Sequence, residues 1–374
     1  MDITKVCVMT SAHSCSDVRI FHKECKSLAN FGFDVTLVGP HARDEFKEGV
    51  RIVALPKARN RADRFLRITV RLLVEAIMQN ARVYHFHDPD LIPIGLLLKA
   101  LGKKVIYDVH ELVYFDIADK DWLKFTAIII MAQRIYYIFE KIAVKVFDQI
   151  ILAEDGYLSY FRQHHKSSTK CLTLRNFADL ALIDASDPPD VNRKTKPVII
   201  YVGGLSETYG IKSIIKAMYI LKDSAELWLL GKWDGEKFMA ECMSQKGWKY
   251  CRYWGFVPLN EVYSYIKNAD VGISILHPLE NYLTSLPTKA FEYMACGLPM
   301  VMSDFPLWKN IFGECAVFAD PHDRHDIAEK ISYLLDNPEE AIRLGRRGRE
   351  LVESKYNWET ESKKLVDIYR SLLQ

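Results

Sequence analysis

The sequence has almost no net charge, no paired cysteine motif and no long apolar run. It contains 50 Lys and Arg against 48 Asp and Glu, a net charge of +2, so no overall field attracts nucleic acid. Its 8 cysteines form no C-x2-C pair and no histidines stand at zinc-finger spacing. We therefore expect reduced, mostly buried thiols, no bound metal and no nucleic-acid partner. No apolar run reaches the roughly 20 residues that span a bilayer.

What the sequence does contain is enough apolar material for two domains. At 374 residues the chain is too long for one ordinary compact domain and comfortable for two. An apolar content of 49% and a charged content of 26% are typical of a soluble globular enzyme. The periodicity of a folded domain begins by Val6, so we expect no signal peptide and a cytoplasmic protein.

Short apolar strands alternate with helical patterns along both halves of the chain. This alternation predicts parallel sheets that are covered by helices on both faces. A polar, proline-punctuated stretch separates the halves, as a linker does. We therefore predict an α/β protein with two doubly wound domains at 1–178 and 198–355, a linker at 179–197 and a final helix at 356–374. The expected strands are 5–10, 34–39, 50–55, 83–87, 104–108, 149–153, 198–202, 225–230, 250–254, 271–275, 299–303 and 316–319.

A short helix in the second half carries the densest chemical signal. Pro287 and Thr288 predict its start, with the threonine as cap, and Gly297 predicts its end. Lys289 falls in the first turn, where a cation opposes the helix macrodipole unless an anion is bound nearby. Glu292 lies on the same side of the helix, and its carboxylate suits the two hydroxyls of a ribose. We interpret the pair as a phosphate and ribose site, with an ordinary surface Lys–Glu pair as the alternative.

The same helix carries a resemblance to a known family. Its sequence F-E-Y-M-A-C-G-L-P at 291–299 is similar to the motif of family 4 glycosyltransferases. That family has the GT-B fold, in which two Rossmann-like domains enclose a cleft and a C-terminal helix crosses back to the first domain. The resemblance covers essentially the whole chain and is most specific in the second half. Further similar segments are 84–90, 107–111, 175–176, 202–205 with Gly210, 254–257, 269–271 and the final helix.

The resemblance implies a function. It implies a retaining, metal-independent hexosyltransferase of the bacterial surface-polysaccharide type, with a UDP- or GDP-linked sugar as donor and no cofactor. The first domain would bind a lipid-linked or polysaccharide acceptor, and the second the nucleotide sugar. The second half has no D-x-D motif at a strand end, as expected where helix N-termini and basic side chains stabilise the leaving diphosphate. Asp88 and Asp90 have D-x-D spacing in the first half, where we prefer a helix-capping loop.

The resemblance and the predicted strand ends together assign the candidate site residues. His110 follows a strand and so lies at the carboxyl edge of the first sheet, where ligands of such sheets bind; a buried core histidine is the alternative. The catalytic candidates are His110, Lys289 and Glu292. The donor-binding candidates are Gly203, Gly204, Gly210, Val257, Thr284, Ser285, Leu286, Lys289 and Glu292. The acceptor-side candidates are His13, Ser14, Asp17, Arg19 and Glu111.

Three positions depart from the family pattern. Thr284 stands where many members have the first of two glutamates, and Gly204 and Tyr209 stand where many have cations. The cations left for a diphosphate are Lys289 and, from the opening loop, Arg19. A glycosyltransferase-like binding subunit without turnover and a nucleotide-sugar epimerase of GT-B fold are therefore alternative functions.

The first half has further candidates at its strand ends. His85 and His87 alternate along one strand, and we expect them to point to opposite faces, so that at most one faces the cleft. The loop at 11–17 is small and polar and suits the close approach of a ligand. Asp17 and Arg19 can instead pair with each other as a structural link, and both interpretations stay open.

Two segments suggest contact with a membrane surface. Residues 57–72 carry six basic side chains against one acid, with apolar residues between them, and residues 122–146 are almost entirely apolar. Such helices are typical of interfacial anchors. We therefore expect peripheral contact with the inner face of the cell membrane. Sheet-covering helices whose charges face water are the alternative.

Overall fold

The chain folds into two compact units in a computed structural model. The structure describes residues 3–117, 126–165, 170–186 and 196–374. Unit 1 contains Met1–Asn176 and Thr360–Gln374, and unit 2 contains Phe177–Glu359. Each unit has its own sheet and its own buried hydrophobic clusters.

Unit 1 is built on an eight-stranded sheet in the order β3-β4-β2-β1-β5-β6-β7-β8. Neighbouring strands are parallel, except that β3 and β4 are antiparallel. The order reverses between β1 and β5, and ligands of such sheets bind at the carboxyl ends of the strands at this switch point. The strands are β1 (Lys5–Met9), β2 (Asp34–Pro40), β3 (Glu45–Lys47), β4 (Val50–Leu55), β5 (Val83–Phe86), β6 (Lys104–Val109), β7 (Gln149–Leu152) and β8 (Cys171–Thr173).

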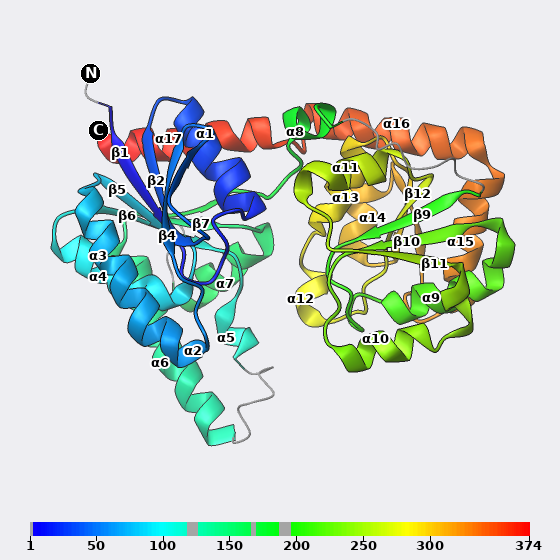
Figure 1. Cartoon of the computed structure of the whole chain (residues 1–374), viewed down its shortest axis with the longest axis horizontal. Helices are drawn as coiled ribbons and strands as arrows, with labels where there is room; N and C mark the ends of the chain where they lie inside the picture. The colour runs from blue at the N-terminus through cyan, green and yellow to red at the C-terminus, as the bar shows by residue number, and fades with distance from the viewer. Residues whose placement is uncertain (1–2, 118–125, 166–169, 187–195) are drawn as a thin grey trace. The chain divides into compact units, whose positions relative to one another are not determined.

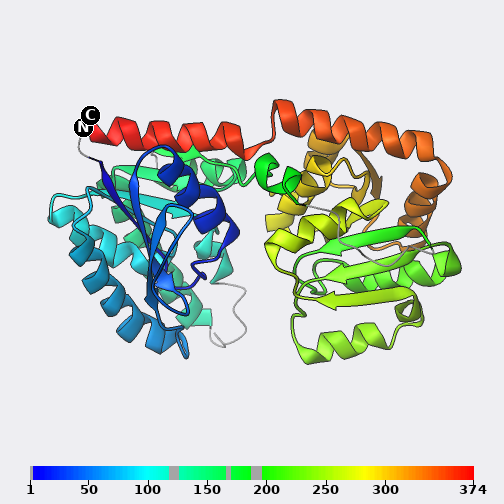
Figure 2. The same ribbon diagram turned by 45° about the horizontal axis from the view of Figure 1, so that its top comes forward.

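Helices cover both faces of this sheet (Figure 1). They are η1 (Val18–Cys25), α1 (Lys26–Asn30), α2 (Arg61–Asp63), η2 (Arg64–Ile68), α3 (Thr69–Gln79), η3 (Pro89–Leu91), α4 (Ile92–Ala100), α5 (Val113–Asp116), α6 (Thr126–Val146), α7 (Asp155–His165) and α17 (Trp358–Leu373). Leu72 of α3 and Ala143 of α6 share one core cluster with Tyr84 of β5, so both helices pack on the same face. Helix α17 lies along unit 1 (Figure 2), and the hydroxyl of its Tyr369 is 2.9 Å from His85 Nδ1.

His85 and His87 lie on the same face of the sheet, so the expectation of opposite faces is wrong. Successive residues of a strand alternate, and residues two apart therefore point the same way. The two ring centroids are 4.6 Å apart. Both rings approach Glu24 Oε2 to 3.8 Å and also face the carboxylate of Asp108.

Unit 2 is built on a six-stranded, fully parallel sheet in the order β11-β10-β9-β12-β13-β14. Its order reverses between β9 and β12, which gives unit 2 a switch point of its own. The strands are β9 (Val198–Val202), β10 (Glu226–Leu230), β11 (Cys251–Gly255), β12 (Val271–Ser274), β13 (Met300–Ser303) and β14 (Ala316–Ala319).

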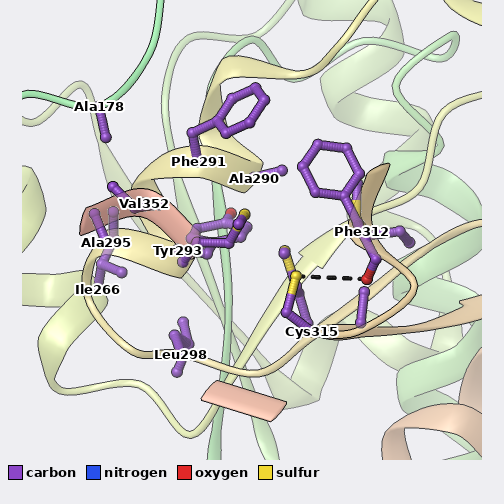
Figure 3. Close-up of a cluster of buried hydrophobic side chains, with 14 of the residues drawn as sticks. Ala178, Ile266, Ala290, Phe291, Tyr293, Ala295, Leu298, Phe312, Cys315 and Val352 are labelled. Carbon is purple, nitrogen blue, oxygen red and sulfur yellow. Dashed lines mark hydrogen bonds between the residues drawn. The ribbon is translucent and has the colours of Figure 1, made fainter. Parts of the chain in front are cut away.

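The helices of unit 2 enclose a hydrophobic cluster on each face of the sheet. They are α8 (Leu180–Asp184), α9 (Ile211–Leu221), η4 (Lys222–Ser224), α10 (Glu236–Met243), η5 (Lys246–Tyr250), α11 (Leu259–Lys267), α12 (Glu280–Leu283), α13 (Thr288–Ala295), α14 (Pro306–Phe312), α15 (Arg324–Asp336) and α16 (Pro338–Ser354). Figure 3 shows the cluster into which α13 packs through Phe291 and Tyr293. Gly345 of α16 lets this helix approach α13, because a Cβ there would lie 2.1 Å from Gly297 O.

The structure confirms the predicted α/β class and every expected strand to within about one residue at each end. It adds the short strands β3 and β8, which the apolar pattern did not indicate. Helix α8 lies inside the predicted linker, and residues 187–195 of that linker lie outside the described residues. All cysteines are free thiols, and only Cys251 and Cys296 are not fully buried. Among the described residues, no helix is both long and apolar enough to cross a membrane.

Candidate functional site

The carboxyl end of β9 leads into a glycine turn at the switch point of unit 2. The Gly203 N–H donates to Leu230 O at the end of β10 (2.9 Å), and its φ is +131°. The backbone of Gly231 packs directly on this turn, since a Cβ there would lie 1.8 Å from Gly203 O. Gly210 caps α9 with a φ of +64°, and its own Cβ would lie 2.3 Å from Ile275 O beyond β12. Glycine is therefore required where α9 begins beside the switch point.

Helix α13 is fixed to the same edge of the sheet by one tyrosine. The Tyr293 hydroxyl accepts from the Val202 N–H (3.1 Å) and donates to Ile200 O (3.2 Å), so it joins α13 to β9. Gly272 leaves room for the tyrosine ring, because a Cβ there would lie 2.6 Å from it. The predicted helix is found at Thr288–Ala295, but Thr288 does not cap it: Pro287 occupies the N-cap position and no side chain caps the helix. Helix α13 begins beside the Gly203 turn.

Lys289 places its ammonium next to that turn. Its Nζ lies 3.8 Å from the centroid of the Tyr201 ring and 5.3 Å from that of Tyr209, and a Cβ at Gly203 would lie 3.1 Å from it. Over the described residues, no carboxylate oxygen lies within 4.0 Å of this ammonium. Burial lowers the pKa of Lys289 to about 7, although the charge of Glu292 raises it. A cation held over tyrosine faces without an anion is suited to receive one.

Glu292 lies one turn further along α13. It is half-buried, and the Tyr263 hydroxyl of α11 lies 3.5 Å from its Oε1. No ion pair joins it to Lys289 among the described residues, so the surface-pair alternative is not the arrangement found. Val257 is half-buried in the loop after β11 and packs against the same cluster as α13.

The segment that enters α13 is held by a buried tryptophan. Trp308 Nε1 donates to Ser285 O (2.8 Å), and Leu286 packs against the core. The Thr284 hydroxyl donates to Glu280 O and Asn281 O at the end of α12. Thr284 therefore ends a helix, and its hydroxyl is engaged by the backbone. Gly204 is exposed, and its carbonyl accepts from the Tyr201 hydroxyl (2.8 Å).

His110 lies at the carboxyl end of β6 in unit 1, as expected, and its side chain is 16% exposed. Its Nε2 is 3.1 Å from His87 Nδ1 and 3.3 Å from Asp108 Oδ2. Its backbone carbonyl accepts from the Tyr157 hydroxyl (3.0 Å). His110 is therefore a half-buried ring at the edge of a buried polar cluster, which excludes the core-histidine alternative. Glu111, the next residue, is exposed.

The loop at 11–17 is tied to the end of β5 through Asp88. The carboxylate of Asp88 accepts from the Thr10 hydroxyl (2.7 Å) and from the Ser11 N–H (2.7 Å). Asp88 occupies the N-cap position of η3, but its side chain makes no hydrogen bond to the N–H groups of that helix. The interpretation of Asp88 as a helix-capping side chain is therefore wrong. His13 lies 3.5 Å from Asp88, and its ring centroid lies 5.7 Å from that of His110. The structure thus places His13 near His110 at the switch point of unit 1.

Ser14 and Asp17 shape the same loop rather than projecting freely. Ser14 accepts from the Ser16 N–H through its hydroxyl and from the Asp17 N–H through its carbonyl. The Asp17 carboxylate caps η1 by accepting from the N–H groups of Arg19 and Ile20. Both residues therefore set the backbone path between β1 and η1.

Arg19 is buried, and its guanidinium does not pair with the carboxylate of Asp17. Its guanidinium is bidentate to Asp108 (2.9 to 3.1 Å), lies 2.9 Å from Glu24 and donates to Leu174 O. With 5% of its side chain exposed, it is committed to the interior of unit 1. The expectation that the Arg19 guanidinium contacts a ligand is therefore wrong, and the link between Arg19 and Asp17 is made through the Arg19 backbone N–H.

Several residues of these sites were not singled out from the sequence. In unit 2 they are Tyr201 and Tyr282, whose rings flank Lys289 and Tyr209, and in unit 1 they are Glu24 and Asp108. The sequence did contain a signal for Asp108, which is an acidic residue within the apolar strand 104–109. Because a charge is rarely buried without a partner, such a residue indicates a buried polar contact.

Comparison with known proteins shows which sequences and folds the chain resembles. Residues 184–351 match the protein family described as glycosyl transferases group 1. The chain is 33% identical over 92 residues, 24% of its length, to an MMP alpha-(1->4)-mannosyltransferase of Mycolicibacterium hassiacum, of which 22% is covered. It is 24% identical over 196 residues, 50% of its length, to a glycogen synthase of Mycobacterium tuberculosis, of which 46% is covered. The chain thus spans less than half the length of these curated relatives.

Solved structures resemble the chain over its whole length. Sucrose-phosphate synthase from Thermosynechococcus elongatus superposes with a TM-score of 0.78 at 19% identity, covering 99% of both chains. Anabaena HepE in complex with UDP-glucose superposes with a TM-score of 0.73 at 11% identity, covering 98% of this chain and 99% of that one. At these identities the likeness establishes the fold. Residues 184–351 thus resemble the glycosyl transferases group 1 family, within a chain that has a GT-B-type, two-domain α/β fold.

Proposed function

We propose that the protein is a retaining, metal-independent hexosyltransferase of the family 4 type. It moves a sugar from a UDP- or GDP-linked donor to a lipid-linked or polysaccharide acceptor, without a cofactor. The observation that carries the proposal is the Lys289 ammonium, which has no anionic partner among the described residues and lies beside the Gly203 turn at the switch point. Support comes from the glycosyl transferases group 1 match of the same domain and from HepE, which was solved with UDP-glucose.

The donor diphosphate would lie against the Gly203 turn and the Lys289 ammonium. The N-terminus of α9 at Gly210 adds backbone N–H groups and the positive end of the helix dipole. The N–H groups of Ser285 and Leu286, at the entry to α13, would be further donors. One turn along, Glu292 would accept the two ribose hydroxyls and Val257 would contact the base.

These groups suit the departure of a nucleoside diphosphate. The bond to the leaving phosphate breaks as negative charge develops on its oxygens, and preorganised donors stabilise that charge without reorganising. Lys289 would supply the positive charge that family 4 glycosyltransferases are expected to draw from the positions of Gly204 and Tyr209. In unit 1, His110 would contact the transferred sugar, while His13, Ser14, Asp17 and Glu111 would line the acceptor side.

The acceptor would be reached at a membrane surface through two helical segments of unit 1. On α6 every exposed charged side chain is basic (Arg134, Lys141 and Lys145), and its one acid, Glu140, is buried. Exposed apolar residues with interspersed basic charges match the interface of an anionic bilayer. The exposed apolar side chains are Phe65, Leu66, Val70, Val74, Ile77 and Met78 on η2 and α3, and Ile128, Ile130, Met131, Ile135, Ile138, Phe139, Ile142 and Val146 on α6. Residues 122–125 lie outside the described residues.

Sugar transfer to a membrane extract tests the proposal. Purified wild type would be incubated with radiolabelled UDP- and GDP-sugars, and the labelled lipid or polysaccharide product would be quantified. We expect transfer from donors of one base, and loss of transfer in Lys289→Ala and Glu292→Ala.

Matched controls come from the same unit. Lys309 is exposed and pairs with Asp304, and Glu261 is exposed in the first turn of α11. Lys309→Ala and Glu261→Ala should keep full activity. Full activity in Lys289→Ala would reject the site, and donor binding without turnover by wild type would favour the binding-subunit alternative.

A further inference from the structure

A buried polar cluster lies directly behind His110. It contains Arg19, Glu24, His85, His87 and Asp108, and each of these side chains is at most 5% exposed. His87 and Asp108 both contact His110 Nε2, at 3.1 and 3.3 Å. The cluster therefore determines what this ring nitrogen can do.

The ionisation of the cluster follows from its contacts. Burial alone would raise the pKa of Asp108, but the bidentate Arg19 guanidinium and the neighbouring histidines hold it well below its usual range. Burial lowers the pKa of His87 to about 4. Burial and the charge of Asp108 raise the pKa of Glu24 well above its usual range. The Asp108 carboxylate is therefore stabilised in its ionised form beside the Arg19 guanidinium, whereas burial favours the neutral forms of His87 and Glu24.

The same groups have the composition of a metal site, but Arg19 argues against that occupant. Glu24, His85, His87 and Asp108 each direct one ligand atom to within 4.8 Å of the others. The guanidinium lies about 2.9 Å from oxygens of both carboxyl groups, so it already supplies the cation that balances the ionised Asp108. A divalent ion there would face a permanently charged neighbour that cannot lose its proton.

The position of one proton follows from these charges. If His110 Nε2 carried a lone pair, that lone pair would lie 3.3 Å from the ionised Asp108 carboxylate and would be repelled. A proton on Nε2 is instead attracted by the Asp108 carboxylate, 3.3 Å away, and can donate to His87 Nδ1, 3.1 Å away. A neutral His110 then has its lone pair on Nδ1, which makes no hydrogen bond within the described part of the chain.

We propose that Asp108 and His87 are positioning residues that fix His110 as its Nε2–H tautomer, so that Nδ1 accepts a hydrogen bond from a hydroxyl of the bound sugar. The tautomer follows from unit 1 alone, and the contact with sugar rests on the proposed function. An equivalent arrangement, in which a buried carboxylate fixes the tautomer of a reacting histidine, is known from the serine protease triad.

Nitrogen NMR of histidine-labelled protein tests the tautomer without any substrate. The full chain would be labelled at the imidazole nitrogens, and the His110 signals assigned by their loss in His110→Gln. In the spectrum of the neutral ring we expect a protonated Nε2 and an unprotonated Nδ1. A neutral ring protonated at Nδ1 would overturn the proposal. Because this readout needs no transfer, it remains decisive even if the proposed function fails.

Asp108→Asn tests the positioning role. The amide keeps the shape but offers N–H groups to His110 Nε2, so the proton should move to Nδ1 and appear there in the spectrum. We expect kcat for transfer to fall by about 10²-fold. Asp148→Asn is the matched control, because Asp148 accepts from Lys99 and the Val105 N–H, away from the cluster. An unaltered tautomer, or equal loss in both variants, would contradict the assignment.

Discussion

The Lys289 ammonium lies 3.8 Å from the centroid of the Tyr201 ring, at the end of the strand that leads into the Gly203 turn. Tyr201 is fully buried and hydrogen-bonded to Gly204 O, so the ring is a fixed platform under the charge. A cation over an aromatic face is stabilised electrostatically, yet it keeps its hydrogen-bond donors for a ligand. This relationship ties the donor site to the sheet.

Binding of a nucleoside diphosphate should be accompanied by proton uptake at Lys289. The free protein has a Lys289 pKa of about 7, because burial disfavours the ammonium, and a bound diphosphate restores the charge and raises the pKa. Above pH 7 the free amine is largely neutral, so affinity falls as pH rises. Calorimetry in buffers of different ionisation enthalpy measures the uptake.

Lys289→Met should abolish that uptake and weaken binding by about 10- to 100-fold, since a charge-assisted hydrogen bond contributes about 1.5–3 kcal/mol. Lys309→Met should behave as wild type, because Lys309 is an exposed residue paired with Asp304. Equal uptake in all three proteins would mean that the proton is taken up by the nucleotide or elsewhere.

Gly210→Ala should destabilise unit 2 and weaken the donor site together. The added Cβ would meet Ile275 O at 2.3 Å, at a φ of +64° that L side chains rarely adopt. We expect a loss of about 2 kcal/mol or more in the free energy of unfolding, measured by denaturant titration. Two causes contribute to this loss, the steric contact of the added Cβ and the positive φ. Gly235→Ala separates them, because the φ of Gly235 is also positive (+94°) but nothing lies within 4 Å of the added carbon. A smaller loss at Gly210 than at Gly235 would refute the steric argument.

Unit 1 should bind anionic vesicles through η2, α3 and α6. Leu66 is 74% exposed and Ile138 56% exposed, and burying such a side chain contributes about 1.5–3 kcal/mol. Leu66→Ser and Ile138→Ser should each lower partitioning onto phosphatidylglycerol vesicles by about 10-fold. Salt should weaken binding of wild type, because the basic charges are screened.

The matched control for the membrane prediction is Ile342→Ser in unit 2, where Ile342 is 69% exposed on α16. It should bind vesicles as wild type does. Equal binding to neutral and anionic vesicles would contradict the proposed role of the basic side chains. No binding to any vesicle would contradict the proposed membrane-binding surface.

Glu24→Gln should become progressively more stable than wild type as pH rises. Burial and Asp108 raise the folded-state pKa of Glu24, so folding favours its protonated form. The protonated carboxyl group stabilises the folded protein fully below the pKa that Glu24 has in the unfolded chain. As the pH rises from there through the folded-state pKa, this stabilisation is lost at about 1.4 kcal/mol per pH unit. Glutamine mimics the neutral acid at every pH. Denaturation of both proteins at several pH values measures the difference, and a constant difference would show that Glu24 does not change its charge on folding.

The sequence predicted what depends on local pattern. Buried parallel strands are continuous apolar runs, and the bounds of α13 follow from Pro287 and Gly297, so both were found at their expected positions. The short edge strands β3 and β8 have three residues each and carry too little pattern to be recognised.

Contacts between distant residues were not predictable in the same way. Arg19 meets Asp108 across 89 positions and Lys289 meets the ring of Tyr201 across the sheet, and no local pattern encodes either pairing. The orientation of His85 and His87, in contrast, was predictable, because residues two apart in a strand point to the same face of the sheet. The expectation of opposite faces applied this rule wrongly.

Thermal unfolding with added nucleotides tests the central claim most directly. Wild type, Lys289→Ala and Lys309→Ala would be melted alone and with UDP, GDP and their sugar conjugates. A ligand that binds only the folded state at 100 times its Kd stabilises by about 2.7 kcal/mol. The account predicts a raised Tm with nucleotides of one base for wild type and Lys309→Ala, and a much smaller shift for Lys289→Ala. The same shift in Lys289→Ala, or none in wild type with any nucleotide, would contradict it.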